Sequence, residues 1–320
     1  MSAIVRREVR ALGVEVRGDV LGNTIALLPG SAGSGRVVAL VAHADQIGLI
    51  ASGVDENGLL RVRTLATWRP RSAIGHRFRV LTRAGEVPAV ALRVGESESP
   101  EWSDVRLDVG ARDAAEALAL VAPGDPAVFA SEPVELVGGR FASPAIDDRV
   151  GVFVVVEALR RLAADPPAWD IALVASTQEE SGDYLGARAA LAALAPEIAV
   201  VVESTYASDV PSDYEPWGGI PLGGGPSVFR GAVVHPAVAD GLVEAAVGAG
   251  VPYGFEAGKE TWSDADGIAA QPGLALGLLS VPTRSSHTAV EVAQLSDVEA
   301  AVAILEVYVR SLDPALDLVR

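Results

Sequence analysis

Five short polar segments interrupt otherwise apolar stretches of the chain, and they carry the residues best able to do chemistry. They are His43-Ala44-Asp45, Asp147-Asp148-Arg149, Gln178-Glu179-Glu180, Glu203, and Arg284-Ser285-Ser286-His287. Burying several carboxylates together is costly unless a cation compensates their charge. Two histidines with three carboxylates suit a pair of divalent ions, such as Zn²⁺ or Co²⁺, about 3.5 to 4 Å apart, with one aspartate shared between them. The segments therefore predict a dinuclear metal site.

The spacing inside two of these segments suggests how the roles divide. His43 and Asp45 are two residues apart, so in an extended strand both point to the same face, and Asp45 can hold the second ring nitrogen of His43. Glu179 and Glu180 are adjacent, and in a loop beyond a strand one can bind metal while the other faces the activated water. Taken singly, each segment is more often a solvated loop, a surface hydrogen bond or a helix N-cap. Their joint placement favours a catalytic centre.

Largely apolar runs precede four of these segments and are typical of buried strands. The runs cover residues 36–42, 170–175, 198–202 and 275–281. Helical periodicity of apolar residues between them, as at residues 148–164, predicts an α/β fold: a mixed, mostly parallel sheet flanked by helices. Sites in such sheets are built beyond the carboxyl ends of the strands. We therefore expect the candidate ligands to meet at one edge of the sheet.

Residues 51–137 have a different hydrophobic pattern. Short runs in which apolar and polar residues alternate are separated by turn signals such as Glu56-Asn57-Gly58. This pattern predicts a small inserted β-rich, barrel-like domain. The catalytic domain would then be discontinuous, formed by residues 1–50 and 138–320. Further helices are expected from about His235-Pro236 and near Ser296, where Ser296 and Glu299 have the spacing of a capping box.

Composition excludes several classes of function. The 320 residues include 25 basic and 42 acidic ones, for a net charge of −17, so binding to nucleic acid or to an anionic membrane is not expected. No uninterrupted apolar run approaches the 18 or so residues of a membrane helix, and charges near the N-terminus interrupt any signal-peptide core. A cytoplasmic location is the default expectation. The absence of cysteine rules out disulfides, thiolate catalysis and zinc fingers, so any metal site must use His, Asp and Glu.

The motifs also resemble a known family, the glutamyl or tetrahedral aminopeptidases, which are dinuclear metallopeptidases. The resemblance covers nearly the whole chain and rests on five motifs in order: VAHADQIG at residues 41–48, DDRVG at 147–151, QEESG at 178–182, STYASDVP at 204–211 after Glu203, and PTRSSH at 282–287. One such motif alone would be a weak signal, whereas five in order are specific.

The resemblance implies a role for each candidate residue. Asp147 would bridge two divalent ions, zinc or cobalt, with His43 and Glu203 completing one site. Glu180 and His287 would complete the other site. Glu179 would be the general base that activates a metal-bridging water, and Asp45 would support catalysis from behind His43. The implied activity is release of the N-terminal residue from peptides. The smaller domain would mediate homo-oligomerisation, as in the hollow tetrahedral dodecamers of the family.

The chain departs from the family pattern at a few positions. Glu203 stands where Asp is usual, and Gln46 stands where Glu is common, so metal affinity or substrate preference is open. The family's first helix would be missing before Val5. Asp209, Arg284 and Asp264 lie in segments that the resemblance places near the substrate, and neither an acidic nor a leucine side-chain preference is decided by the sequence.

Other functions remain open at this point. Glu203 also suits a related metallo-carboxypeptidase or deacylase. The altered ligands would equally suit a catalytically impaired shell or binding subunit. A glycosidase acting through Glu179 and Glu180 fits less well, since adjacent carboxylates do not readily flank one bond and the histidines would be unexplained.

Overall fold

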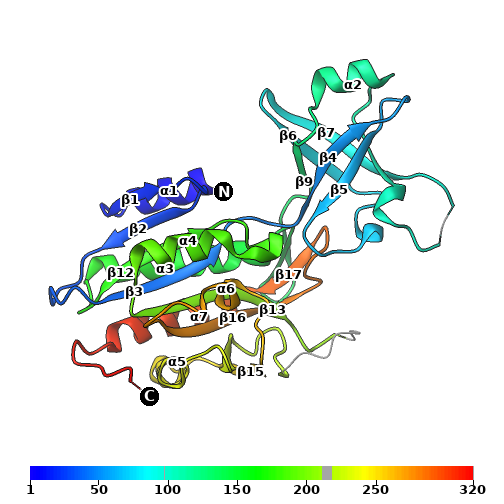
Figure 1. Cartoon of the computed structure of the whole chain (residues 1–320). Coiled ribbons are helices and arrows are strands. Elements are labelled where there is room, and N and C mark those ends of the chain that lie inside the picture. The colour runs from blue at the N-terminus through cyan, green and yellow to red at the C-terminus, as the bar shows by residue number, and fades with distance from the viewer. Residues whose placement is uncertain (97, 211–217, 320) are drawn as a thin grey trace.

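The computed structural model describes residues 1–96, 98–210 and 218–319, so Pro211, the last residue of the fourth motif, lies outside the described residues. Its largest feature is a mixed sheet with helices on both faces (Figure 1). In spatial order its main strands are β1 (Glu15–Gly18), β2 (Thr24–Leu28), β12 (Asp170–Ser176), β3 (Val37–His43), β13 (Ile198–Tyr206), β16 (Ala275–Arg284), β17 (Glu291–Gln294), β11 (Arg140–Ser143) and β10 (Val134–Leu136). Two further strands, β14 (Ser227–Gly231) and β15 (Gly254–Gly258), join this sheet through β16.

The four central strands, β12, β3, β13 and β16, are mutually parallel. Their sequences are rich in Val, Leu, Ile and Ala and almost every residue is buried, as expected for strands covered on both faces. Because the strands are parallel, their carboxyl ends meet at one edge, where the polar segments of the sequence also begin. The predicted α/β fold with a mostly parallel sheet flanked by helices is confirmed.

Helices cover the sheet in two layers. One layer contains α1 (Ser2–Arg10), α3 (Ile146–Ala164), α5 (Pro236–Ala249) and α7 (Leu295–Ser311), which pack in a row. The other contains α4 (Leu185–Leu194) and α6 (Asp264–Ile268), which pack on each other. Right-handed crossovers between parallel strands account for the placement of α3 and α4 on opposite faces, because β3 to β12 and β12 to β13 run in opposite directions across the sheet.

The inserted unit is a closed barrel that projects from one end of the sheet (Figure 1). Its strands, in barrel order, are β4 (Gly48–Val54), β5 (Leu60–Leu65), β8 (Val105–Asp108), β7 (Gly85–Arg93), β6 (Arg77–Thr82) and β9 (Pro126–Phe129). Helix α2 (Ala114–Leu120) and two short 3₁₀ turns, Pro70–Ser72 and Trp102–Asp104, lie in its connections. A separate apolar core that includes Leu49, Leu60, Phe78 and Leu107 fills the barrel. The predicted barrel-like insertion is thus present.

The sequence boundaries of the barrel differ slightly from those of the expected insertion at residues 51–137. The first barrel strand begins at Gly48, and the last ends at Phe129. Strand β10 belongs to the large sheet, where Leu136 pairs with Arg140. The reason is local: Gly138 and Gly139 both have positive φ, which lets the chain reverse tightly onto β11.

Three features near the chain ends and helix starts also refine the expectations. Helix α1 precedes the first strand and buries its own Val5 and Val9, whereas the family's first helix was expected to be missing before Val5. Helix α5 starts at Pro236 behind the N-cap His235, as predicted. The predicted capping box at Ser296 is wrong, because α7 already starts at Leu295 and has no side-chain cap.

No helix in the described part of the chain is long and apolar enough to cross a membrane.

Candidate metal centre and active site

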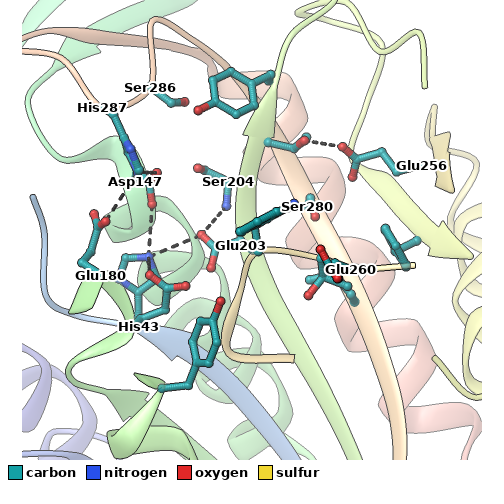
Figure 2. Close-up of a pocket in the computed structure, with 18 of the residues that line it drawn as sticks. His43, Asp147, Glu180, Glu203, Ser204, Glu256, Glu260, Ser280, Ser286 and His287 are labelled. Carbon is teal, nitrogen blue, oxygen red and sulfur yellow. Dashed lines mark hydrogen bonds and ion pairs between the residues drawn. The ribbon is translucent and has the colours of Figure 1, made fainter. Parts of the chain in front are cut away.

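A cavity of about 370 Å³ opens at the carboxyl ends of the parallel strands (Figure 2). His43 is the last residue of β3, Glu203 lies within β13, and the Glu179–Glu180 pair follows β12. His287 comes just after β16. The cavity is lined by all of these residues and by Asp147 from the start of α3. The fold therefore brings together the residues that the sequence proposed as ligands and base.

Asp147 sits between the two histidines. Its Oδ1 lies 3.1 Å from His43 Nε2, and its Oδ2 lies 3.5 Å from His287 Nε2. On the one side, Glu203 Oε1 is 3.5 Å from His43 Nε2; on the other, Glu180 Oε2 is 3.4 Å from His287 Nε2. This is the arrangement of two histidine–carboxylate pairs that share one aspartate, as a dinuclear centre requires.

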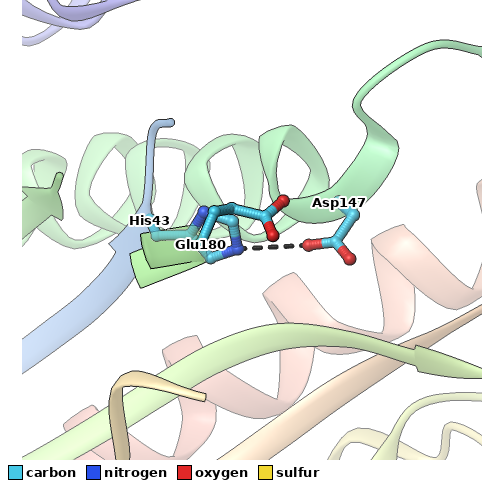
Figure 3. Close-up of side chains that lie close together, drawn as sticks. All are labelled: His43, Asp147 and Glu180. Carbon is cyan, nitrogen blue, oxygen red and sulfur yellow. Dashed lines mark hydrogen bonds and ion pairs between the residues drawn. The ribbon is translucent and has the colours of Figure 1, made fainter. Parts of the chain in front are cut away.

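Two ligand groups in the described residues are compact enough to hold a metal ion. His43, Asp147 and Glu180 converge on one point, as Figure 3 shows. His43 with Asp148 and Glu203 forms the second group. Buried oxygens of Asp148 (Oδ2) and Glu180 (Oε1) have no hydrogen-bond partner among the described residues, and such atoms are costly unless a cation or water reaches them. The donor set of imidazoles and carboxylates therefore fits Zn²⁺-like divalent ions.

Burial and mutual charge interactions shift the pKa values of the acidic groups and of His287 in this cluster. Burial raises the pKa of Glu180 to about 8, and Asp147 adds to the effect. Burial also raises the pKa of Glu203. Burial alone would raise the pKa of Asp147 too, but His287 and His43 hold it below its usual range. Burial alone would lower the pKa of His287, yet the neighbouring carboxylates raise it to about 10. A site that binds protons this tightly binds cations instead when metal is supplied.

Glu179 is buried at the edge of the cluster. Its Oε2 is 3.8 Å from His43 Nε2, the longest of the His43 contacts. Burial raises the pKa of Glu179 to about 10, with Glu203 and Asp264 adding to the effect and His43 opposing it. Without a cation this carboxyl group would stay protonated near neutral pH. A divalent ion beside it would favour the ionised form, in which a carboxylate can act as a general base.

Asp45 lies behind the metal-facing groups. Its Oδ1 is 3.5 Å from His43 Nδ1, the ring nitrogen that points away from Asp147. Its two oxygens also accept hydrogen bonds from the backbone N–H groups of Glu179 (3.3 Å) and Glu180 (3.2 Å). One side chain thus orients a histidine and the two adjacent glutamates, the supporting arrangement expected around a metal ligand.

The loop that carries the glutamates is fixed by close backbone packing. Gly186, at the start of α4, lies so near the end of β12 that an added Cβ would be 2.2 Å from the Thr177 carbonyl oxygen. Buried Asn23 joins the two, because its Nδ2 donates to the Gly186 carbonyl and its Oδ1 accepts from the Thr177 N–H. Gln178, which lies between Thr177 and Glu179 in the sequence, adopts a left-handed φ of 64°. Non-glycine residues in this conformation persist where surrounding structure imposes it.

Asp148 is fully buried next to Asp147, and the peptide bond between them is cis. Its Oδ1 accepts the Gly151 N–H at 2.9 Å. Only glycine fits at position 151, because an added Cβ would lie 2.3 Å from Asp148 Oδ2. Asp148 thus caps the regular part of α3, which gives the second aspartate and the glycine of the DDRVG motif a structural role.

Two further contributors to the site lie outside the five motifs. Glu291, at the start of β17, is 1% exposed and accepts the backbone N–H groups of Asp147 (2.9 Å) and His287 (3.0 Å). The Thr67 carbonyl oxygen, from the barrel, lies 3.0 Å from His287 Nδ1. A buried acid in the strand after His287 is the signal that could have revealed Glu291. A backbone carbonyl such as that of Thr67 has no sequence signal.

The three residues expected near the substrate do not line the cavity. Arg284 and Asp209 are bonded to each other, with Arg284 Nε 3.0 Å from Asp209 Oδ1. Asp264 is buried beneath the cavity, where Ser176 Oγ donates to it. Burial raises the pKa of Asp264 to about 7. Arg284 and Asp209 therefore form an ion pair outside the cavity lining. Asp264 is a buried neighbour of the candidate centre.

Comparison with known proteins agrees with this geometry. Residues 22–304 match the sequence pattern of the M42 glutamyl aminopeptidases. The chain is 33% identical to a lysyl aminopeptidase of Pyrococcus furiosus over an alignment of 314 residues that covers 94% of this chain and 88% of the relative. The solved structure of an aminopeptidase from the archaeon Desulfurococcus kamchatkensis superposes with a TM-score of 0.90 at 32% identity, covering 98% and 90% of the two chains.

A second solved structure is that of the TET1 peptidase of Pyrococcus horikoshii, described as assembling into a tetrahedron or a large octahedral shell. It superposes with a TM-score of 0.84 at 27% identity, covering 97% of this chain and 93% of that one. The matched range includes every ligand candidate, and the fold agrees across nearly the whole chain. The chain therefore belongs to the M42 glutamyl aminopeptidase family, whose members are metal-dependent peptidases.

Proposed function

We propose that this protein is a co-catalytic dinuclear metallo-aminopeptidase that releases the N-terminal residue of peptides. One observation carries the choice of an aminopeptidase: the cavity is lined by six carboxylates, and among the described lining residues there is no Lys or Arg. The six are Asp147, Glu179, Glu180, Glu203, Glu256 and Glu260. Two divalent ions would balance the charge of Asp147, Glu179, Glu180 and Glu203. The two remaining carboxylates, Glu256 and Glu260, would attract a free substrate ammonium and repel the free carboxylate needed by a carboxypeptidase.

The proposed ligands divide between two divalent ions. Asp147 would bridge them, His43 and Glu203 would complete one site, and Glu180 and His287 the other. Support comes from the shared position of Asp147 between the two histidines. Bound there, the ions would polarise the scissile carbonyl and lower the pKa of the attacking water. Zinc and cobalt both suit these donors.

Glu179 is the proposed proton carrier. Its buried carboxylate faces the cavity without belonging to either compact ligand group, which leaves it free for substrate and water. It would accept a proton as the water attacks the carbonyl carbon and then pass that proton to the leaving amine. Asp45 holds His43 and the loop in position throughout.

We also propose that the chain forms homo-oligomers through its barrel and assembles into a hollow shell, by analogy with the TET1 peptidase. Such an enclosure would restrict substrates to unfolded peptides. Sedimentation of the purified protein tests this idea, and a monomer at micromolar concentration would contradict it.

The decisive experiment on the activity compares the wild type with Glu179→Gln. The variant keeps shape and all five ligands, so we expect two divalent ions per chain in both proteins but a fall in kcat of about 10²- to 10⁴-fold on aminoacyl-anilides. Glu244→Gln, an exposed change on α5, serves as the matched control. Comparison of N-blocked with C-blocked dipeptides completes the test. Turnover of N-blocked substrates, or full activity of Glu179→Gln, would contradict the proposal.

A further inference from the structure

Trp262 is an exposed aromatic residue among those that line the cavity. It is 68% exposed, whereas Phe229 and Leu278, which line the same cavity, are 4% and 2% exposed. Lining residues that are largely open to solvent mark the mouth of a cavity, and buried ones mark its interior. Trp262 therefore lies at the mouth, in the loop between β15 and α6 that also carries Glu260, labelled in Figure 2.

The backbone of Trp262 has a conformation that a bulky residue rarely adopts. Its φ is 53°, in the left-handed region that favours glycine. The carboxylate of Asp266, on α6, imposes this conformation from outside. It accepts the Thr261 N–H at 3.0 Å and the Trp262 N–H at 2.9 Å. Strained non-glycine residues of this kind cluster at active sites and ligand clamps.

The indole ring of Trp262 has no role in holding this loop. In the part of the chain that the structure describes, it makes no hydrogen bond, ring contact or cation–π contact. The hydrogen bonds to Asp266 come from the backbone, so they would form equally well around a glycine. The ring is therefore free to contact a ligand at the mouth of the cavity.

The direction in which a peptide must enter decides which part of it meets this ring. Its ammonium group enters first, attracted by the carboxylates of the cavity. The N-terminal residue then lies inside, beside the buried His43 and Glu203 of the proposed metal centre. The remainder of the peptide, beyond the scissile bond, must extend outwards through the mouth. Trp262 is thus placed to contact the leaving part of the substrate.

Helix α6 connects this loop with the proposed base. Gly267 of α6 packs on Tyr184 so closely that an added Cβ would lie 2.3 Å from the Tyr184 Cβ. Tyr184 lines the cavity and directly follows the turn Glu179–Asp183. Glu179 is the proposed donor of a proton to the leaving amine, so the leaving peptide begins on the side of the cavity formed by these packed segments.

We infer that Trp262 binds the second residue of the substrate, directly after the scissile bond, and that the enzyme favours an aromatic or large apolar side chain there. The inference rests on the proposed aminopeptidase activity. The face of an indole ring packs against aromatic and aliphatic side chains, whereas a glycine offers it no side chain to contact. Selection of the N-terminal residue takes place inside the cavity and is independent of Trp262.

The test measures kcat/KM of the metal-loaded enzyme on the tripeptides X-Phe-Ala and X-Gly-Ala and on X-amide. X is the N-terminal residue that the wild type removes fastest. We expect the wild type to prefer X-Phe-Ala over X-Gly-Ala by about 3- to 10-fold, and Trp262→Gly to lose this preference. Trp262→Phe should retain most of it.

Two controls accompany this comparison. X-amide has no second residue, so its turnover by Trp262→Gly should match that of the wild type, which shows that the fold and the metal centre are intact. Phe153→Ala removes an exposed aromatic ring from α3, outside the cavity lining, and should leave the preference unchanged. If Trp262→Gly does not fold, Trp262→Ala is compared in the same way.

Each other outcome has a distinct meaning. A wild type without preference for phenylalanine over glycine overturns the inference and leaves the aminopeptidase activity standing. An unchanged preference in Trp262→Gly also overturns it. An equal loss on all three substrates does so too, since Trp262 would then act on the N-terminal residue or on the metal centre. No turnover of any substrate by the wild type refutes the proposed function itself.

Discussion

Replacement of Glu291 by glutamine should weaken one half of the metal centre more than the other. The Glu291 carboxylate accepts one backbone N–H from Asp147 and one from His287, at 2.9 and 3.0 Å. Asp147 and His287 are both proposed ligands of the site that Glu180 would complete. The other proposed site shares Asp147 with it, but no hydrogen bond among the described residues joins Glu291 to His43 or Glu203. The substitution Glu291→Gln therefore removes support from two ligands of one proposed site and from one ligand of the other, while it preserves side-chain volume.

The size of the effect follows from the hydrogen bonds. An N–H that donates to a buried ionised acceptor contributes about 1.5 to 3 kcal/mol, and a neutral bond about 1 kcal/mol. Burial raises the pKa of Glu291 to about 8, so the larger range applies to the metal-bound protein, in which nearby cations would keep Glu291 ionised. Glutamine has one carbonyl oxygen, so one bond becomes neutral and the other N–H faces an amide NH₂ group. The total loss is about 2 to 4 kcal/mol, divided between folding and metal binding. We expect a 10- to 100-fold loss of metal affinity at the supported site.

Calorimetric titration of Zn²⁺ into chelator-treated protein measures both sites, and thermal unfolding with and without metal separates folding from binding. The control is Glu299→Gln, the same chemical change at an exposed position on α7. A lower unfolding temperature with both metal affinities unchanged would refute the reasoning, because Glu291 would then support only the fold. Equal weakening of both sites would show a general loss of charge rather than support of particular ligands.

Three further predictions follow from the same contacts. Asp45→Asn should lower kcat about 10- to 100-fold with metal still bound, because the amide holds His43 less well; unchanged kinetics would exclude a positioning role. Gly151→Ala should destabilise the protein by about 1 to 3 kcal/mol in urea unfolding, since the added Cβ collides with the Asp148 carboxylate, and a neutral result would contradict the collision. The folded metal-free protein holds a proton on Glu180 up to a pKa of about 8, so its unfolding temperature should fall as pH rises from about 5 to 8. Divalent metal should abolish that fall, and a flat metal-free profile would count against a proton-loaded cluster.

The sequence was sufficient to predict the parts of the site that depend on strand ends. His43 and Glu203 follow apolar runs, and parallel strands must align their carboxyl ends, so their convergence could be reasoned without coordinates. The role of Asp45 behind His43 came from two-residue spacing alone, and the 3.5 Å contact agrees with it. These inferences succeeded because strand periodicity is a local property of the chain.

Other features depend on contacts between distant segments, and local patterns do not encode them. Arg284 was expected near the substrate, yet its side chain is bonded to Asp209, 75 residues away in the chain. Asp264 faces Ser176 below the cavity rather than the substrate. The end of the barrel was misplaced by a few residues because alternation in β10 resembles that of the barrel strands. Only pairing with β11 assigns it to the large sheet.

The two histidines show why the barrel is part of the site rather than an appendage. Each imidazole offers Nε2 to the shared Asp147, and in each case an acceptor lies near Nδ1. For His43 this is the Asp45 carboxylate from the large sheet, whereas for His287 it is the Thr67 carbonyl from the barrel. An acceptor at Nδ1 fixes the tautomer that leaves Nε2 free to bind metal. Any movement of the barrel against the sheet would therefore change the orientation of His287, and we expect both proposed metal sites to form only when the two domains keep this relative position.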